Sequence, residues 1–180
     1  MTRAFVAIRP PDAVLEEVDA LSASLDLGGA RRTTRDQWHV TLQFLGNSAD
    51  VDAVADALTD VRVPAASARF GGLGAFPSNK RARVVWLGVA QGAELFGALA
   101  REVGERLTPL GHVPEARAYH AHLTLARLKT PADVRAALAA DAAAVGDAWL
   151  VDEVILYESR VRRTGAEYTP VASVSLAPPG

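Results

Sequence analysis

The chain carries the pattern His-x-Thr-Leu twice, beginning at His39 and at His122. Side chains two residues apart point to the same face of a strand, so Thr41 shares a face with His39, and Thr124 shares one with His122. A single histidine on a strand is most often structural. Two copies on strands rich in Val and Leu, where burying an unpaired polar group is costly, favour a function instead. The repeat therefore predicts one site built from two histidines and two threonines.

Two imidazoles suit displacement at phosphorus, in which an attacking water loses a proton and an alkoxide leaving group gains one. Imidazole titrates near neutral pH, so a pair of histidines can hold one proton between them. Threonine hydroxyls can donate hydrogen bonds to the non-bridging phosphate oxygens. A guanidinium matches two phosphate oxygens, and Arg127 follows His122 by five residues. The residues thus predict general acid and base catalysis on a phosphate ester.

A repeated order of strand and helix positions the two motifs. Alternating apolar residues predict strands over 3–9, 38–45, 66–70, 83–89, 121–128, 149–159 and 167–176, and helical spacing predicts helices over 14–25, 51–58 and 93–107. Thr130 and Pro131 are typical helix-start residues and predict a fourth helix to about Val145. His39 and His122 lie 83 positions apart, as do the candidate helix starts Asp50 and Asp133. The two halves of the chain therefore look duplicated.

The duplication predicts an α+β fold with two lobes related by a pseudo-two-fold axis. We expect the lobes to cover approximately residues 1–75 and 80–180 of one domain, 1–180, with the Gly- and Pro-containing stretch 71–80 as their joint. Each lobe would pair antiparallel strands and cover them with two helices. The two histidine strands would then face one cleft between the lobes.

Composition removes several classes of function. The 180 residues contain no cysteine, which excludes disulfides, thiolate zinc sites, iron–sulfur clusters and a cysteine nucleophile. A net charge of −2 argues against wrapping long duplexes, although a local group of arginines can still bind a phosphate. The apolar stretch at residues 1–8 is too short to span a membrane and lacks a cleavage pattern. We therefore expect a soluble, cytoplasmic protein without a membrane partner.

The motifs resemble those of the two-histidine phosphoesterases, in particular the RNA 2′,3′-cyclic phosphodiesterases first described as 2′-5′ RNA ligases. That family has the extended motifs His-x-Thr-x-x-Phe and His-x-Thr-x-x-Arg, and this chain matches both at every fixed position. The resemblance runs nearly end to end and rests on Arg3-Ala-Phe-Val-Ala-Ile8, His39-Val-Thr-Leu-Gln-Phe-Leu-Gly46, Phe76-Pro77, Arg83-Val-Val-Trp-Leu-Gly-Val89, His122-Leu-Thr-Leu-Ala-Arg127, Leu156-Tyr-Glu-Ser159, Gly165 and Tyr168.

The resemblance implies an enzyme that hydrolyses RNA 2′,3′-cyclic phosphate ends to 2′-phosphate ends, with weak reversible 2′-5′ ligation as a side activity. His39 would be the general acid that protonates the ribose O3′, and His122 the general base that activates water. Thr41 and Thr124 would hold the phosphate. No metal and no cofactor is implied. The partner would be a single-stranded RNA terminus or a nucleotide, and we expect a monomer.

By the same resemblance, Arg127 would stabilise charge on the phosphate, and Phe44 would stack on the terminal base. Both residues lie five positions after their histidine. A regular strand would therefore point them to the opposite face, where Phe44 would be a core aromatic and Arg127 a surface ion-pairing residue. Only a bulge, a strand end or a strong twist would redirect them.

Two alternatives stay open. The same chemistry could act on small nucleotides such as a cyclic phosphate of ADP-ribose, or the fold could serve as a non-catalytic nucleotide-binding module. Further candidates for contact with an RNA strand are the basic residues and exposed rings near the motifs, namely Arg31, Arg32, Arg35, Lys80, Arg81, Arg83, Trp38, Tyr119 and His120.

Overall fold

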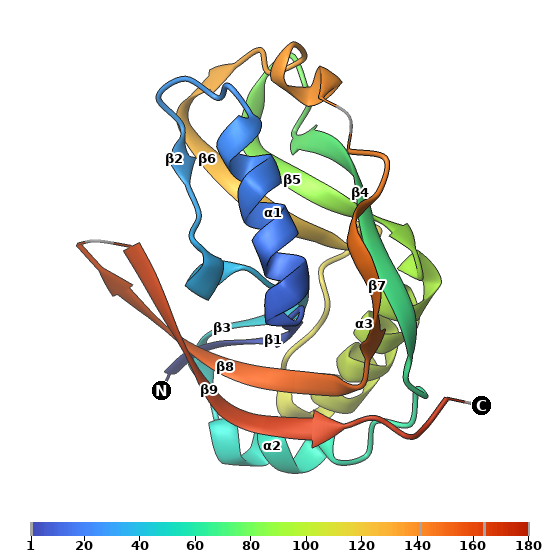
Figure 1. Cartoon of the computed structure of the whole chain (residues 1–180). Coiled ribbons are helices and arrows are strands. Elements are labelled where there is room, and N and C mark those ends of the chain that lie inside the picture. Colours follow the sequence, from blue (N-terminus) through green and yellow to red (C-terminus); the bar gives the residue numbers. More distant parts are fainter. Residues whose placement is uncertain (1, 141, 164, 180) are drawn as a thin grey trace.

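The computed structural model describes residues 2–140, 142–163 and 165–179. In this part of the chain, one nine-stranded antiparallel sheet is combined with three α-helices (Figure 1), which confirms the α+β class. The strands are β1 (Thr2–Ile8), β2 (Arg31–Arg32), β3 (Val40–Ala49), β4 (Ala66–Phe76), β5 (Ala82–Gln91), β6 (His122–Ala132), β7 (Val145–Val151), β8 (Glu153–Arg162) and β9 (Gly165–Ser175). The helices are α1 (Asp12–Ser24), α2 (Val51–Leu58) and α3 (Ala93–Leu107).

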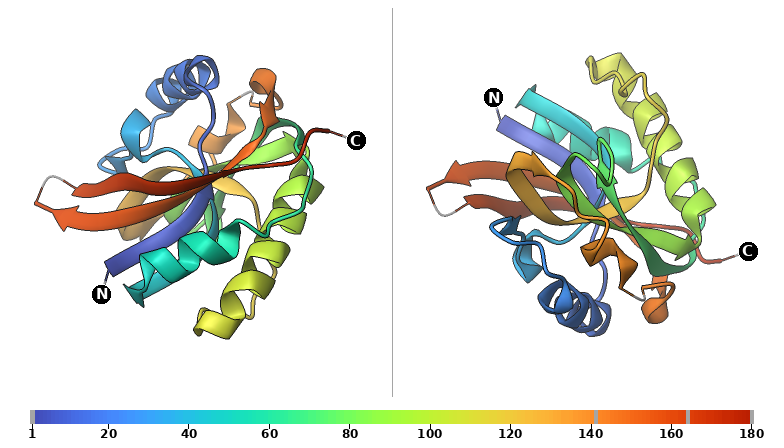
Figure 2. Two further views of the ribbon diagram at one scale, coloured as in Figure 1. Left: turned by 90° about the horizontal axis from the view of Figure 1, so that it is seen from below. Right: turned by 90° about the horizontal axis from the view of Figure 1, so that it is seen from above.

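The strands are hydrogen-bonded in the order β7-β4-β5-β6-β3-β1-β8-β9, and β2 pairs with β6 in addition. Both views of Figure 2 show α1 on one side of the sheet and α2 with α3 on the other. The two motif strands, β3 and β6, are neighbours at the middle of this order. They share one paired position, Val40 opposite Leu123.

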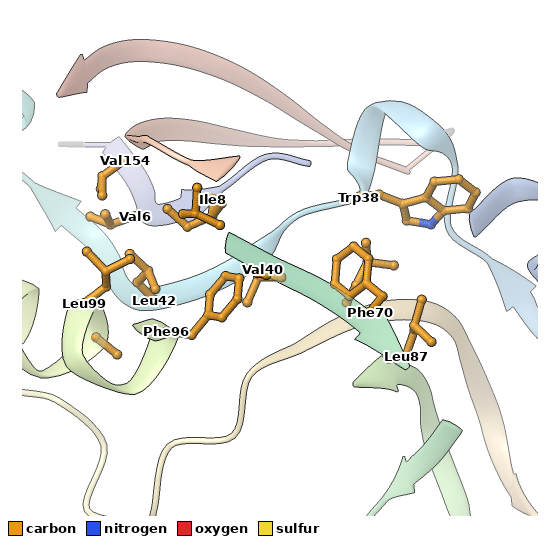
Figure 3. Close-up of a cluster of buried hydrophobic side chains, with 14 of the residues drawn as sticks. Val6, Ile8, Trp38, Val40, Leu42, Phe70, Leu87, Phe96, Leu99 and Val154 are labelled. Atoms are coloured by element: carbon orange, nitrogen blue, oxygen red, sulfur yellow. The ribbon is translucent and has the colours of Figure 1, made fainter. Parts of the chain in front are cut away.

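A buried apolar core holds the motif strands in place. Val40 and Leu42 of β3 pack toward Phe96 and Leu99 of α3 (Figure 3), and all four side chains are buried. Burying a large aliphatic or aromatic side chain is worth about 1.5–3 kcal/mol. This one-sided burial fixes which face of β3 points inward and leaves the face that carries Thr41 for the cleft.

The predicted fourth helix is wrong. β6 continues through Thr130 and Pro131 to Ala132, a short 3₁₀ helix follows at Ala137–Ala139, and β7 begins at Val145; residue 141 lies outside the described residues. The segment is rich in alanine, but helix propensity is a weak preference when no apolar face is buried along the helix. Pairing with β5 instead extends β6. Asp133 binds Arg135 and does not start an α-helix.

Three further boundaries differ from the expectation. Residues 71–76 belong to β4 rather than to a joint, and they pair with β5. Gly74 is required there because a side chain at this position would overlap the indole ring of Trp86. The segment 149–159 is two strands, β7 and β8, divided at Asp152. β3 continues past Gly46 to Ala49, and α2 follows with Asp50 as its N-cap, whose side chain accepts a hydrogen bond from the Ala53 amide at 3.2 Å.

Strands from the first and second halves of the chain are mixed along the sheet. β4 pairs with β5 and β7, whereas β8, near the end of the chain, pairs with β1. The division into lobes at 1–75 and 80–180 therefore stays a prediction about how the sequence was duplicated. Within the described residues, no helix combines the length and the apolar character that crossing a membrane requires.

Candidate active site

The two His-x-Thr motifs meet where β3 and β6 are paired. Val40 and Leu123 point into the core. The alternation of strand side chains sends His39, Thr41, His122 and Thr124 to the other face. All four line one cleft of about 800 Å³. The structure thus brings together the two pairs that the sequence predicts in one site.

A β-bulge interrupts each motif strand three residues after its histidine. On β3, Val6 pairs with Gln43 and Ala7 with Thr41, so Leu42 is the extra residue. On β6, Val85 pairs with Ala126 and Trp86 with Thr124, so Leu125 is the extra residue. An extra residue shifts the alternation by one position. The shift places position +5 on the same face as the histidine in both halves.

The bulges resolve the parity conflict for Phe44 and Arg127. Phe44 is 57% exposed, so it is not a core aromatic, and both side chains line the cleft with the histidines. Within the described part of the chain, the side chain of Arg127 forms no hydrogen bond or ion pair, so it is not an ion-pairing surface residue. Arg31 on β2 lies directly opposite Arg127. Both residues line the cleft at this end.

The two imidazoles are held in the same way. Nδ1 of His39 lies 2.7 Å from the carbonyl oxygen of Gln37, and Nδ1 of His122 lies 2.7 Å from that of His120, two residues earlier in each case. Because a carbonyl oxygen only accepts, Nδ1 carries the proton in both rings. Nε2 is then the atom that gains or loses a proton. In His39 it lies 3.0 Å from the Thr41 hydroxyl.

Aromatic rings pack against both histidines and leave each imidazole only partly exposed. The ring of His39 packs 4.6 Å from Phe5 and 5.3 Å from Tyr168, centre to centre. The ring of His122 contacts Phe76 edge-on at 5.0 Å. Tyr168 also lines the cleft, and its late position gives no sequence signal apart from the family resemblance.

Burial lowers the pKa of both histidines in the free protein. For His39, burial is the largest cause and outweighs the Gln37 carbonyl, and the charges of His122 and Arg127 act in the same direction, which brings the pKa to about 4. For His122, burial again comes first, opposed by the His120 carbonyl and assisted by Arg127 among its neighbours. A bound anion would raise both pKa values, because it favours the charged imidazolium.

The lining of the cleft is strongly basic. Six arginines line it and, among the described residues, no Asp or Glu does; they are Arg3, Arg31, Arg32, Arg117, Arg127 and Arg162. Arg117 pairs with Glu115, and Arg162 pairs with Glu167. The sequence pointed to Arg31 and Arg32 but missed Arg3, Arg117 and Arg162, because β1, the loop before β6 and the end of β8 are brought to the cleft only by the order of strands in the sheet.

Several other sequence candidates have structural roles. Trp38 is 2% exposed and donates from Nε1 to the Thr33 hydroxyl at 2.8 Å, so it is a core residue. The Tyr119 hydroxyl donates to the Thr41 carbonyl at 2.9 Å and braces that strand. The guanidinium of Arg32 donates to the carbonyls of Ser22 and Leu25 at the end of α1.

The remaining candidates lie outside the site or beside it. Arg35, Lys80, Arg81 and Arg83 are not among the lining residues. The ring of His120 lies 6.0 Å from that of His122, and within residues 2–140, 142–163 and 165–179 no three His, Asp or Glu side chains gather as metal ligands would.

Comparisons with known proteins identify the family. A family model described as the 2′-5′ RNA ligase superfamily matches residues 10–163. An RNA 2′,3′-cyclic phosphodiesterase of Aeropyrum pernix is 34% identical over 160 residues, which cover 85% of this chain and 90% of that protein. One of Escherichia coli is 28% identical over 172 residues, covering 94% of this chain and 93% of the relative.

The fold of a solved structure agrees as well. The crystal structure of E. coli LigT complexed with 3′-AMP matches with a TM-score of 0.79 at 26% identity, covering 98% of both chains. The family model spans most of this chain, including both histidine motifs. The resemblance seen in the sequence is therefore confirmed: the chain is an enzyme of the 2′-5′ RNA ligase superfamily, the two-histidine phosphoesterases.

Proposed function

We propose that the chain hydrolyses RNA 2′,3′-cyclic phosphate ends to 2′-phosphate ends, with His39 as general acid and His122 as general base. The observation that carries this is the pair of equivalent imidazoles, each with Nδ1 on a backbone carbonyl, which leaves Nε2 as the atom that exchanges a proton. The relatives named RNA 2′,3′-cyclic phosphodiesterase support the substrate.

The reaction follows from these atoms. Nε2 of neutral His122 takes a proton from a water molecule while the water oxygen forms a bond to phosphorus. The bond from phosphorus to O3′ breaks, and Nε2 of protonated His39 gives its proton to O3′. The phosphate remains on O2′ as a monoester. Attack by the 5′-hydroxyl of a second RNA in place of water, with O3′ again as the leaving group, would join the two chains through a 2′-5′ phosphodiester, and this would be a weak ligase activity of the same site.

The neighbouring groups would bind the phosphate and the base. Thr41 and Thr124 lie beside the histidines and can donate to the non-bridging oxygens. Arg127 lines the same cleft, and its side chain has no hydrogen bond or ion pair within the described residues. Its guanidinium can donate a bidentate hydrogen bond to two oxygens of a phosphate bound there. The exposed ring of Phe44 offers a face on which the terminal base can stack.

Binding of the substrate also favours the protonated histidine that the reaction requires. With both pKa values lowered, the free protein holds little imidazolium at neutral pH. The negative charge of a phosphodiester next to the two rings raises their pKa values, so one ring can be protonated in the complex. No cofactor or metal takes part in these steps, and since all six candidate residues come from one chain, we propose that a monomer is active.

The test is hydrolysis of a short RNA ending in a 2′,3′-cyclic phosphate in excess EDTA, with His39→Ala and His122→Ala as variants. Conversion by wild type to a 2′-phosphate end, with each variant reduced by at least about 10³-fold, is the expected result. Failure in EDTA but recovery with a divalent cation would disprove metal independence. Turnover of ADP-ribose cyclic phosphate but not of RNA would assign the site to small nucleotides. Binding without any turnover would indicate a nucleotide-binding module.

A further inference from the structure

We infer that the cleft contains a second phosphate site, formed by Arg3, for the 5′-phosphate of the nucleotide that carries the cyclic phosphate. The inference rests on the proposed function and names the substrate class more closely. It predicts that the enzyme prefers RNA ends of at least two nucleotides, or 5′-phosphorylated nucleotides, to nucleoside 2′,3′-cyclic phosphates that lack a 5′-phosphate.

The register of β1 against β3 sets the order of groups along the cleft. Ala7 lies opposite Thr41, Phe5 opposite Phe44, and Ala4 opposite Gly46. Arg3 shares a face of β1 with Phe5, and it lines the cleft together with Phe44. From Ala7 to Arg3 the strand advances four residues, or about 13 Å. The order is therefore the reacting phosphate at Thr41, the ring of Phe44, and then the guanidinium of Arg3.

A terminal nucleotide presents its groups in the same order. The cyclic phosphate lies on one side of the ribose, the base projects from the sugar, and the 5′-phosphate lies on the other side. With the base on Phe44, whose ring centre is 6.0 Å from that of Phe5, the 5′-phosphate would point toward Arg3. The side chain of Arg3 is long and flexible, so its guanidinium can extend toward a 5′-phosphate at this position.

The charge of Arg3 has no partner in the described part of the protein. Its side chain is exposed, and it forms no hydrogen bond or ion pair there, in contrast to Arg117 and Arg162, which pair with glutamates. Because β6 runs antiparallel to β3, Arg127 lies toward the other end of the cleft from Phe44. The cleft thus carries an unpaired guanidinium on each side of the histidines, one for each phosphate.

The experiment compares ligands that differ only in the 5′-phosphate. We would measure kcat/KM for adenosine 2′,3′-cyclic phosphate with and without a 5′-phosphate, and, by calorimetry, Kd for adenosine 2′-phosphate and adenosine 2′,5′-bisphosphate. The proteins are wild type, Arg3→Gln, and Arg101→Gln, which removes the same charge from the exposed surface of α3 outside the cleft.

In wild type and in Arg101→Gln, a charge-assisted hydrogen bond to the 5′-phosphate should raise kcat/KM about tenfold and lower Kd about tenfold, relative to the ligand without that phosphate. Arg3→Gln should reduce both advantages to about twofold or less. An advantage that is equal in all three proteins, or no advantage in wild type, would overturn the inference. If wild type turns over neither these cyclic phosphates nor the short RNA, the proposed function fails, whereas the Kd ratios still decide the role of Arg3.

Discussion

Leu42 and Leu125 are equivalent residues: each is the extra residue of a β-bulge, and each lies three positions after a histidine of the cleft. The duplication therefore extends beyond the histidines to the irregularity of the strands that carry them. In the first half the bulge turns Phe44 into the cleft, and in the second half it turns Arg127 there. The same backbone device thus presents an aromatic ring on one side of the histidines and a cation on the other.

The first prediction concerns Arg127. Arg127→Gln should lower kcat/KM on a cyclic phosphate end by about 10²–10³-fold, because it removes a preorganised donor to the phosphate oxygens. Arg127→Lys keeps the charge but loses the planar guanidinium, so its activity should fall between those of wild type and Arg127→Gln. Arg135→Gln, a change at a surface pair with Asp133, is the control. Equal activity of Arg127→Gln and this control would remove Arg127 from the site.

The second prediction concerns Phe44. Phe44→Ala should raise KM by about tenfold or more, since stacking on an aromatic ring contributes about 1–3 kcal/mol per base. Phe44→Trp should retain binding. The ring is 57% exposed, so neither change should destabilise the fold much. The fully buried Phe96 is the matched control: Phe96→Ala should cost about 3–5 kcal/mol of stability in urea unfolding. A loss of stability with Phe44→Ala but no change in KM would contradict the assignment.

These residues also show what the sequence could predict and what it could not. The alternation around His39 and His122 places both rings and both threonines in one cleft, because the strand period alone decides their face. Leu42 and Leu125 are ordinary apolar residues, and only their register against β1 and β5 shows that they are bulged. The direction of Phe44 and Arg127 therefore followed from the family resemblance and not from the strand pattern.

Other differences have a similar cause. The alanine-rich segment after Pro131 favours a helix locally, but pairing with neighbouring strands decides its structure. In the sequence, Arg3 is only a polar residue at the start of the first predicted strand. It becomes a cleft residue because β1 lies between β3 and β8 in the sheet, and sheet order depends on contacts between distant parts of the chain. Arg162 reaches the cleft from β8 for the same reason.

The third prediction concerns the pH dependence of activity. Catalysis requires one protonated and one neutral histidine, and both pKa values are lowered in the free protein. The singly protonated free enzyme is therefore most abundant below neutral pH, which sets the optimum of kcat/KM. In the complex the phosphate raises the pKa values, so the optimum of kcat should lie at higher pH. Steady-state kinetics from pH 4 to 9 would measure both profiles, and an optimum of kcat/KM at or above that of kcat would contradict the assignment.

The fourth prediction concerns stability in acid. The pKa of His39 is about 4 in the folded protein, against an ordinary value of 6.5. The unfolded chain therefore binds a proton at this residue more readily than the folded protein does. Stability from this source is fully present above pH 6.5 and is lost as the pH falls toward 4, by up to about 3 kcal/mol.

Replacement of the ring isolates this contribution. His39→Gln should flatten the dependence of the free energy of unfolding on pH between 6.5 and 4, measured by urea titration at several pH values. Adding His122→Gln should flatten it further, because the pKa of His122 is lowered by the same burial. Parallel pH profiles for wild type and both variants would mean that burial against Phe5 and Phe76 does not lower the pKa values of the two rings in the free protein.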